Sequence, residues 1–480
     1  MSADSVPSSS IDAIPDAVPS VPDAVPSVPE LVARLRGSFD AGRTRPIDWR
    51  LGQLERLRAL LTENGAALVR ALEADLRKPD PEGWVTDIGF TIGDLDFARK
   101  KLRSWAKPKK VATPLQLQPA RSWLVPEPVG LVLVIAPWNY PVQLALAPLA
   151  AAIAAGNCAV VKPSEVTARV SNVLAELLPR YLDPDCFAIV EGGVAETQAL
   201  LAERWDHIFY TGNGRVGRIV MEAAARHLTP VTLELGGKSP CLVDEDVDLE
   251  LTARRIAWGK FLNCGQTCVA PDYVLVHRAR EAELIDKIAA NVRAFYGEDP
   301  QRSPDLARIV NEQHVDRLAK LLESGTAVIG GTVDRADRYV APTILRDVAP
   351  DAPVMQEEIF GPILPVLPVA GMDEAIAFVN ARPKPLALYV FTNRQAVEDA
   401  VIARTSAGGV TVNAAIWHLG NPNLPFGGVG ESGMGAYHGK HGFDAMSHWK
   451  PVLKKSWWAD PSIGYPPYTK WKKALIKRFA

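Results

Sequence analysis

The stretch from Val129 to Val161, VGLVLVIAPWNYPVQLALAPLAAAIAAGNCAVV, contains no charged side chain and constrains the fold more than any other part of the chain. Its length would suit a membrane span. Prolines interrupt it, however, and it divides into a strand over 129–136, a helix over 142–155 and a strand over 158–162. Buried parallel strands and the helix that covers them are apolar on all sides without contacting lipid. The stretch therefore predicts a strand-helix-strand unit at the centre of a parallel sheet.

Strands and helices continue to alternate after this unit, and residues 31 to about 108 have the three- and four-residue apolar spacing of helices. A second alternation runs from Leu249 to about Asn413 and is long enough for its own core. The further strands are expected at 187–193, 207–212, 231–236, 273–279, 326–331 and 386–392. Such alternation is typical of doubly wound parallel sheets. The predicted fold class is α/β, with two doubly wound-type α/β domains.

Charge and cysteine content limit the function. The 53 Lys and Arg residues against 55 Asp and Glu residues leave no basic footprint for nucleic acid, so no such partner is expected. Five cysteines without paired spacing or a secretory leader predict free thiols in a reducing compartment, hence a cytoplasmic location. Residues 1–30 repeat DAVPSVP and contain too many prolines for a helix or strand, which predicts a disordered tail.

Two segments could carry chemistry on this frame. TGNGRVG (211–217) places a G-x-G-x-x-G pattern between a strand and a helix, where backbone amides can approach a pyrophosphate, although any tight glycine-rich turn gives the same pattern. Glu234 follows at about the distance of a ribose-binding acid. FLNCGQTCVAP (261–271) carries Cys264 and Cys268. A cysteine is either an activated thiolate or a small buried apolar residue, and for one cysteine alone the second interpretation would be preferred.

Six motifs in order change that balance: PWNYP (137–141), VKPSE (161–165), LELGGK (233–238), GQTC (265–268), EEIFGP (357–362) and LPFGGVGESGMG (424–435). Each is weak alone, but as an ordered set they resemble the aldehyde dehydrogenase superfamily over essentially the whole chain beyond residue 31. The segments RRIAWGKFLNCGQTCVAPDY, KPLALYVFT and YHGKHGFDAMSH resemble its class 3 branch. This resemblance implies oxidation of a medium- or long-chain aliphatic or aromatic aldehyde with NAD or NADP.

The resemblance also implies three catalytic residues. Cys268, which ends G-Q-T-C, would be the nucleophile that forms a thiohemiacetal and then a thioester. The side-chain amide of Asn139 and the backbone N–H of Cys268 would stabilise the oxyanion. Glu234 would activate the water that hydrolyses the thioester, an interpretation that displaces the ribose-binding one because Glu234 lies inside LELGGK.

Cofactor and substrate positions follow from the same motifs. Lys162 and Glu165 would hold the adenosine ribose, where an acid disfavours a 2′-phosphate, although class 3 enzymes often tolerate it. No metal ligands are expected. The full set of expected cofactor-binding residues is Trp138, Lys162, Glu165, Gly212, Gly217, Glu358 and Phe360. The expected substrate pocket is lined by Tyr140, Trp258, Cys264 and His418, although clustered aromatic residues are more often plain core.

The predicted domain order is a tail (1–30), a cofactor-binding domain (31–111 and 127–233), a catalytic domain (234–432) and an oligomerisation arm (112–126 and 433–460). The arm resembles the family's dimerisation flap, so a homodimer is expected. Residues 461–480 predict a basic amphipathic helix that resembles the one over the substrate funnel of fatty aldehyde dehydrogenases. Its contact with a membrane would be peripheral at most.

Three other functions share some of these features. A CoA-acylating semialdehyde dehydrogenase would have the cysteine but generally lacks the glutamate at the position of Glu234. A cysteine hydrolase without redox chemistry needs a histidine base, which folding could bring to Cys268 although none is near it in sequence. An inactive structural relative would be expected to have lost one of the three implied catalytic residues, and all three are present.

Overall fold

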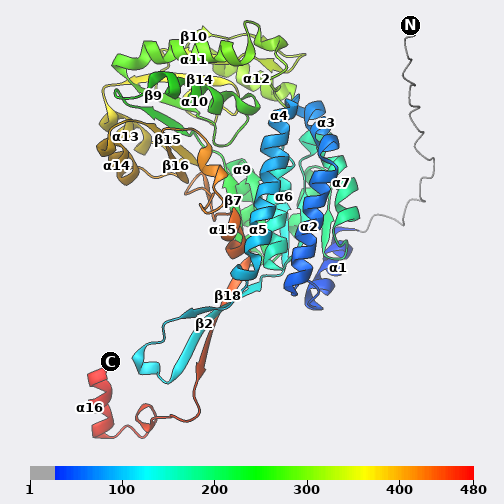
Figure 1. Ribbon diagram of the computed structural model, residues 1–480, viewed down its shortest axis with the longest axis vertical. Helices are drawn as coiled ribbons and strands as arrows, with labels where there is room; N and C mark the ends of the chain where they lie inside the picture. The colour runs from blue at the N-terminus through cyan, green and yellow to red at the C-terminus, as the bar shows by residue number, and fades with distance from the viewer. Residues whose placement is uncertain (1–26, 480) are drawn as a thin grey trace, which may run out of the picture.

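A computed structural model describes residues 27–479 and contains two sheet-based domains and a projecting arm (Figure 1). The first domain holds a six-stranded sheet in the order β17-β7-β6-β3-β4-β5, parallel except for β17. Its strands are β3 (Leu131–Ile135), β4 (Cys158–Lys162), β5 (Phe187–Ile189), β6 (His207–Gly212), β7 (Val231–Leu235) and β17 (Gly433–Met434). The helices between them are α6 (Gln143–Ala155), α7 (Ala168–Tyr181), α8 (Val194–Ala202) and α9 (Gly214–Ala225). These positions confirm the predicted alternation.

The uncharged stretch forms β3, α6 and β4, as expected. Nearly every residue of α6 is buried, because the helix contacts β3 and β4 on one side and the outer helices α2 and α5 on the other. Burial on both sides explains why the stretch has no charged residue. Among the described residues, no helix is both long enough and apolar enough to cross a membrane.

The outer helical layer is α1 (Val28–Asp40), α2 (Ile47–Glu63), α3 (Gly65–Leu76), α4 (Asp80–Gly83), the π-helix η1 (Trp84–Gly89) and α5 (Phe90–Trp105). The predicted disordered tail falls on residues 1–30, of which 1–26 lie outside the described residues. Its last three residues differ from the prediction, because α1 already begins at Val28. Ser27 and Glu30 form a capping box there, which satisfies backbone groups at the helix start.

The second domain holds a seven-stranded sheet in the order β10-β13-β14-β9-β8-β15-β16, parallel except for β10. Its strands are β8 (Pro240–Val243), β9 (Tyr273–His277), β10 (Thr326–Ile329), β13 (Thr343–Arg346), β14 (Ile363–Val369), β15 (Ala387–Phe391) and β16 (Gly409–Val412). Its helices are α10 (Leu249–Phe261), α11 (Glu281–Tyr296), α12 (Glu312–Leu321), α13 (Met372–Asn380) and α14 (Gln395–Arg404). A separate hydrophobic core lies in this domain, as its length predicts.

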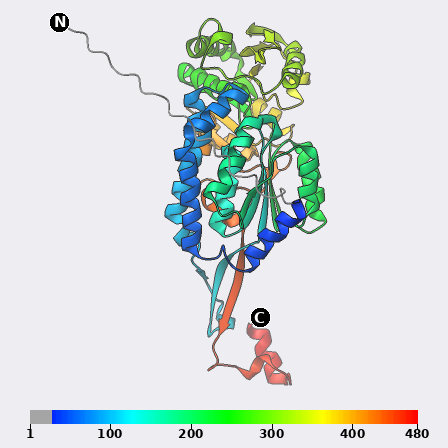
Figure 2. The same ribbon diagram turned by 90° about the vertical axis from the view of Figure 1, so that its right-hand side faces the viewer.

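The arm is a three-stranded antiparallel sheet of β1 (Lys109–Val111), β2 (Ala120–Pro128) and β18 (Ser447–Lys455) that extends away from both domains (Figures 1 and 2). Its bounds differ from the predicted ones. β1 begins inside the range assigned to the cofactor-binding domain. Residues 433–446 belong to the body, because β17 pairs with β7 and α15 (Gly439–Ala445) packs on α5 and α6.

The chain ends in α16 (Lys470–Phe479), which lies beyond the arm and away from both domains of its own chain (Figure 1). Within the described residues it packs against the short turn Ser462–Gly464. The helix predicted over the substrate funnel is therefore present, but it does not cover the catalytic domain of the same chain. The preceding strand β18 runs outward along the arm, so the helix that follows it in sequence lies beyond the arm.

Candidate active site

Most of the candidate residues of the first domain lie at the carboxyl ends of its parallel strands. β3 leads into Trp138, Asn139 and Tyr140, β4 ends at Lys162, and β6 ends at Gly212. The chain passes from β3 to β4 and β5 on one side, then returns to β6 and β7 on the other. Ligands of doubly wound sheets bind at this reversal of strand order.

The loop that carries Cys268 begins with a left-handed turn after α10. Asn263, Cys264 and Gly265 have φ values of 51°, 53° and 74°. Only glycine takes this conformation without strain. A Cβ on Gly265 would also lie 2.3 Å from a backbone oxygen, that of Gly361. The turn is held by Gln266, whose side chain donates to the oxygens of Asn263 (3.1 Å) and Arg308 (2.9 Å) and accepts from the N–H of Val310 (2.9 Å).

This turn gives the two cysteines different surroundings. Cys264 packs into the hydrophobic core of the second domain and is only 1% exposed. Its burial suits a structural role and differs from the predicted one of lining the substrate pocket. Cys268 is partly exposed. Of the two, Cys268 is therefore the thiol that a substrate can reach.

Burial and negative charge act on both thiols. Burial raises the pKa of the Cys264 thiol to about 12. The pKa of Cys268 is raised mainly by burial and further by the negative charges of Glu358 and Glu234. A thiol in this environment needs a nearby base or positive charge to react as a thiolate.

Asn139 lies against the cysteine loop. Its side chain is 3% exposed, and its Nδ2 donates to the backbone oxygen of Gln266 at 3.1 Å. The backbone oxygen of Asn139 accepts from Nδ2 of Asn263 at 2.9 Å. The amide of Asn139 is thus held against the cysteine loop at Gln266, two residues before Cys268.

Glu234 lies on β7 between Thr211 of β6 and Gly433 of β17. It is 3% exposed, and neither of its carboxyl oxygens has a hydrogen-bond partner among the described residues. Burial raises the pKa of Glu234 well above its ordinary value. A carboxyl group with a raised pKa is suited to take and return a proton near neutral pH.

The edge of the first sheet carries groups suited to a nucleotide. Lys162 is buried and its Nζ lies 2.6 Å from Oε2 of Glu165, whose side chain is 50% exposed. Partial burial alone would raise the pKa of Glu165, but the hydrogen bond and charge of Lys162 outweigh it and lower the pKa overall. The pair therefore presents an ionised carboxylate to solvent at the end of β4.

The glycines of the G-x-G-x-x-G pattern have a packing reason of their own. A Cβ on Gly212 would lie 2.2 Å from Tyr210 Oη, and a Cβ on Gly217 would lie 2.9 Å from Leu235 Cδ2. The turn starts α9, which is capped by Asn213 through the N–H of Val216. The pattern is therefore explained at least in part by close strand-to-helix packing.

An aromatic pair bridges the two domains. The rings of Trp138 and Phe360 meet edge to face with centroids 5.2 Å apart. Phe360 has a φ of 49°, which is unusual for a bulky residue. Next to it, Glu358 has a buried Oε1 without a partner among the described residues, and burial raises its pKa to about 8. Its carboxyl lies so close to Gly236 that a Cβ there would come within 1.9 Å.

Three of the residues that were expected to line the substrate pocket, Tyr140, Trp258 and His418, have different surroundings. Tyr140 is buried, and its hydroxyl lies 2.6 Å from Thr267 Oγ1, directly beside the cysteine loop. Trp258 and Trp417 are exposed, at 37% and 64%, with ring centroids 5.9 Å apart. His418 is fixed by Thr411 Oγ1 at 2.8 Å from Nδ1, and burial lowers its pKa to about 4, so its ring is neutral near pH 7.

Sequence reasoning missed two groups that build the site. Lys78 and Asp87 form a fully buried ion pair beside Asn139, yet they are far from it in sequence and lie in no recognised motif. Gln266 holds the cysteine loop through three hydrogen bonds and does lie within GQTC. A buried glutamine is expected to satisfy both ends of its amide, which is the signal that could have identified it.

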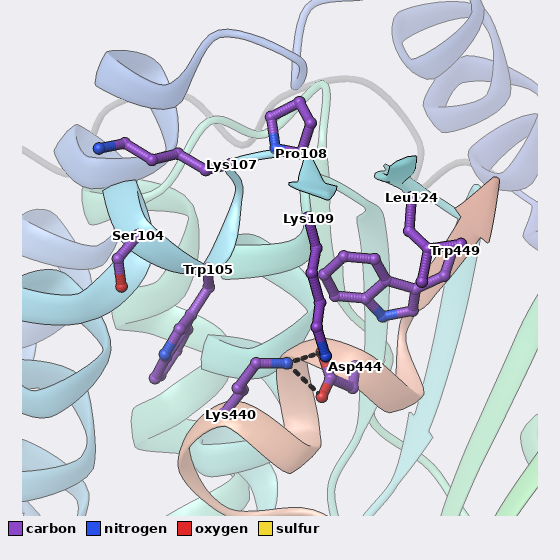
Figure 3. A pocket seen from close by; sticks show the side chains of 9 residues that line it. All are labelled: Ser104, Trp105, Lys107, Pro108, Lys109, Leu124, Lys440, Asp444 and Trp449. Atoms are coloured by element: carbon purple, nitrogen blue, oxygen red, sulfur yellow. Dashed lines mark hydrogen bonds and ion pairs between the residues drawn. The ribbon is translucent and has the colours of Figure 1, made fainter. Parts of the chain in front are cut away.

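A pocket of about 580 Å³ lies at the root of the arm, away from these residues (Figure 3). Trp105 and Trp449 stand on its walls, and the ammonium of Lys440 points to the carboxylate of Asp444. The residues that line it come from α5, the arm strands, α15 and the segments that join them. None of them is a candidate catalytic or cofactor residue, so this pocket is a joint between the arm and the body.

Comparison with known proteins identifies the family. The model of the aldehyde dehydrogenase family matches residues 23–452. The chain belongs to the aldehyde dehydrogenase family. It is 49% identical over 455 residues to aldehyde dehydrogenase family 3 member A2 of Macaca fascicularis, covering 93% of this chain and 94% of that protein. It is 50% identical over 426 residues to the dimeric NADP-preferring aldehyde dehydrogenase of Mus musculus, covering 89% and 94%.

Solved structures of this aldehyde dehydrogenase family agree. The substrate-bound state of Staphylococcus aureus AldH superposes with a TM-score of 0.92 at 45% identity, covering 95% of this chain and 100% of that one. An indole-3-acetaldehyde dehydrogenase in complex with NAD⁺ superposes with a TM-score of 0.82 at 27% identity, covering 89% and 88%. The predicted family and two-domain fold are thus confirmed.

Proposed function

We propose that this aldehyde dehydrogenase oxidises a medium- or long-chain aliphatic or aromatic aldehyde to the carboxylic acid with NAD or NADP. One observation carries the proposal: Asn139 donates to the backbone oxygen of Gln266, two residues before the partly exposed Cys268, and the charge of the unpartnered buried Glu234 raises the pKa of that thiol. A nucleophile, an oxyanion donor and a base are the groups that this oxidation needs. Other arrangements of a lone buried cysteine supply no such set.

In the proposed reaction the thiol of Cys268 first loses its proton to solvent. The thiolate sulfur then bonds to the aldehyde carbon, and the carbonyl π bond breaks so that its oxygen becomes an oxyanion. Nδ2 of Asn139 and the backbone N–H of Cys268 donate hydrogen bonds to that oxygen. NAD or NADP, when bound, would supply the hydride acceptor, and loss of hydride from the carbon would leave a thioester on Cys268. Glu234 then takes a proton from water, the water oxygen bonds to the thioester carbon, and the C–S bond breaks to release the acid and the thiol.

The buried oxygens of Glu234 and Glu358 without protein partners fit a site that binds further polar groups. Lys162 and Glu165 would hold the adenosine ribose. Glu358 would hold the nicotinamide ribose and Phe360 would flank the ring, while Trp138, Gly212 and Gly217 would contact the cofactor. The ionised Glu165 opposes a 2′-phosphate by charge repulsion while the paired Lys162 attracts it, so both NAD and NADP are proposed.

The apolar and aromatic surroundings of the site support the substrate class. Tyr140, Trp258 and His418 are neutral groups, and a pocket of neutral rings suits an aldehyde with an alkyl or aryl tail. One of the relatives named above is aldehyde dehydrogenase family 3 member A2.

The decisive experiment mixes the purified protein with aldehydes of increasing chain length and either cofactor, and follows the absorbance of reduced cofactor. We expect free acid as the product, with Cys268→Ala as the inactive control. Acyl-CoA as the product, formed only when CoA is present, would instead support the CoA-acylating alternative. No cofactor reduction with any aldehyde would refute the proposal.

We further propose a homodimer formed through the arm. β18 is at one edge of the arm sheet and β16 is at one edge of the seven-stranded sheet, so both present backbone groups to a further strand. Several side chains of β18 are exposed in the single chain. A relative is named dimeric. Analytical ultracentrifugation at micromolar concentration should give the mass of two chains, and a monomeric mass would refute this arrangement.

The same arrangement gives α16 a place. Because the arm carries it away from its own domains, we propose that it covers the substrate funnel of the partner subunit and touches anionic lipid at most peripherally. Trp471 of α16 and Trp457, which precedes the helix in sequence, expose apolar surface in the single chain. Deleting residues 470–480 should raise KM for long-chain aldehydes and leave KM for short ones unchanged. An equal effect on both would contradict the cover.

The cytoplasmic location is proposed from five free cysteines.

A further inference from the structure

Lys78 and Asp87 form a buried ion pair next to the site. The proposed reaction gives this pair no role. Both side chains are 0% exposed, and Lys78 Nζ lies 2.8 Å from Asp87 Oδ2. Lys78 follows the end of α3, and Asp87 lies in the π-helix η1. A buried ion pair is often no more stabilising than apolar residues of the same size, so its presence calls for a reason other than stability.

The remaining contacts of the pair converge on one turn. Lys78 Nζ donates to the backbone oxygen of Asn139 at 3.1 Å and stands 4.1 Å from the ring centroid of Tyr140. Asp87 Oδ1 accepts from the N–H groups of Val142 at 3.1 Å and Gln143 at 3.4 Å, at the start of α6. The two side chains therefore grip both ends of residues 139–143, the turn between β3 and α6.

This grip reaches the cysteine loop through the same peptide. The backbone oxygen of Asn139 also accepts from Asn263 Nδ2, which in turn donates to the oxygen of Gln266. Nδ2 of Asn139 donates to that same Gln266 oxygen. The peptide plane of Asn139 and the loop before Cys268 are thus tied together, and Lys78 fixes the plane from the other side.

We propose that Lys78 and Asp87 are positioning residues that set the direction of the Asn139 amide and thereby the oxyanion hole. This inference rests on the proposed role of Asn139. Neither residue contacts the reacting atoms. They act by holding a donor whose misplacement by about 1 Å is enough to lower a rate by about 10²-fold.

The test uses the full chain and a double variant, Lys78→Met with Asp87→Leu, which removes both charges of the pair at similar volume. Glu82, on which the charge of Lys78 also acts, keeps its hydrogen bond from the N–H of Asn263. We expect kcat to fall by about 10- to 10²-fold with little change in the KM for aldehyde, because the loss affects an interaction made in the transition state. A matched control is Arg43→Met with Asp183→Leu. That ion pair (2.8 Å) joins the end of α1 to the loop before β5, and its removal should leave kcat unchanged.

A mutant cycle with Asn139→Ala separates positioning from general stability. Asn139→Ala alone should lower kcat by about 10²- to 10³-fold. If the pair acts through Asn139, adding the double variant to Asn139→Ala should cause no further loss. Losses that multiply, or wild-type kcat in the double variant, would overturn the positioning role. An unimpaired Asn139→Ala enzyme would overturn the oxyanion role, and the positioning role with it.

If the double variant does not fold, Asp87→Asn allows the same cycle. The asparagine oxygen can still accept from the N–H groups of Val142 and Gln143, but the counter-charge of Lys78 is lost. A fall in kcat that disappears in the Asn139→Ala background supports the proposal. An unchanged kcat, or a fall that multiplies with that of Asn139→Ala, overturns it.

Discussion

Replacing Glu234 with glutamine should separate the two halves of the proposed reaction. The side chain is 3% exposed and neither oxygen has a partner among the described residues, so an amide of the same shape displaces no hydrogen bond to the protein. It cannot take a proton from water. We therefore expect Glu234→Gln to fold normally, to form the thioester once, and to stall at its hydrolysis.

The size of the effect follows from the role of a base. General base catalysis contributes about 10²- to 10⁴-fold, which corresponds to about 3–5 kcal/mol in the barrier. The steady-state rate of Glu234→Gln should fall by that factor, after a burst of about one equivalent of reduced cofactor per site. Because burial raises the pKa of Glu234, the wild-type hydrolysis rate should increase with pH as the carboxyl ionises, and the variant should lack this increase.

Rapid mixing with detection of reduced cofactor measures the burst, and mass spectrometry locates the acyl group. Glu222→Gln, an exposed position on α9, is the control and should behave as the wild type. A slower burst in Glu234→Gln would show that Glu234 also deprotonates Cys268. Full steady-state turnover, or an adduct on Cys264, would refute the assignment of roles.

Three further predictions test the site and its frame. Cys268→Ala should lower activity by at least about 10⁴-fold and abolish covalent labelling by substrate, while Cys264→Ala, a change within the core, should stay active, as measured by turnover and mass spectrometry. Relative to the wild type, Glu358→Gln should become more thermally stable as pH rises from 4.5 to about 8. The pKa of Glu358 is raised from 4.5 to about 8 in the folded state, so the wild type loses stability through that window. Equal differences in melting temperature between variant and wild type at both ends of the window would contradict this. Gly265→Ala should destabilise the protein by at least about 1–3 kcal/mol, since φ is 74° and the new Cβ would strike a backbone oxygen, whereas Gly52→Ala in the open middle of α2 should stabilise by up to about 1 kcal/mol, both measured by denaturant unfolding.

Elements with a strong local pattern could be predicted from the sequence. The run from Val129 to Val161 has no reason to be uncharged except burial on both sides, and α6 is buried in that way. The strands that were predicted are short apolar runs bounded by turns, and β3 to β7, β9, β10 and β15 lie within a few residues of the expected ranges. The ranges of β8, β13, β14, β16 and β17 were not predicted. The six ordered motifs predicted the family whose model matches residues 23–452.

Features that depend on contacts between distant segments could not be predicted in this way. The arm boundary predicted at residue 433 differs from the structure, because β17 pairs with β7 and so belongs to the first sheet. β17 has only two residues, which is too short for a sequence pattern to predict this pairing. Cys264 was expected at the pocket because it is close to Cys268 in sequence. The left-handed turn at Asn263 to Gly265 directs its side chain into the core instead. The position of α16 depends on the direction of β18.

The polar groups around the site divide by whether they are satisfied. One set of groups has its hydrogen bonds or charges paired within the protein and therefore holds a fixed geometry. This set consists of Gln266, Asn263 Nδ2, Lys78 and Asp87. The carboxyl oxygens of Glu234 and Oε1 of Glu358 have no protein partners in the part of the chain that the structure describes, and burial raises both pKa values. An unsatisfied buried group destabilises the fold. Such groups persist where they act on a ligand, and paired groups beside them supply the rigidity that the reaction needs.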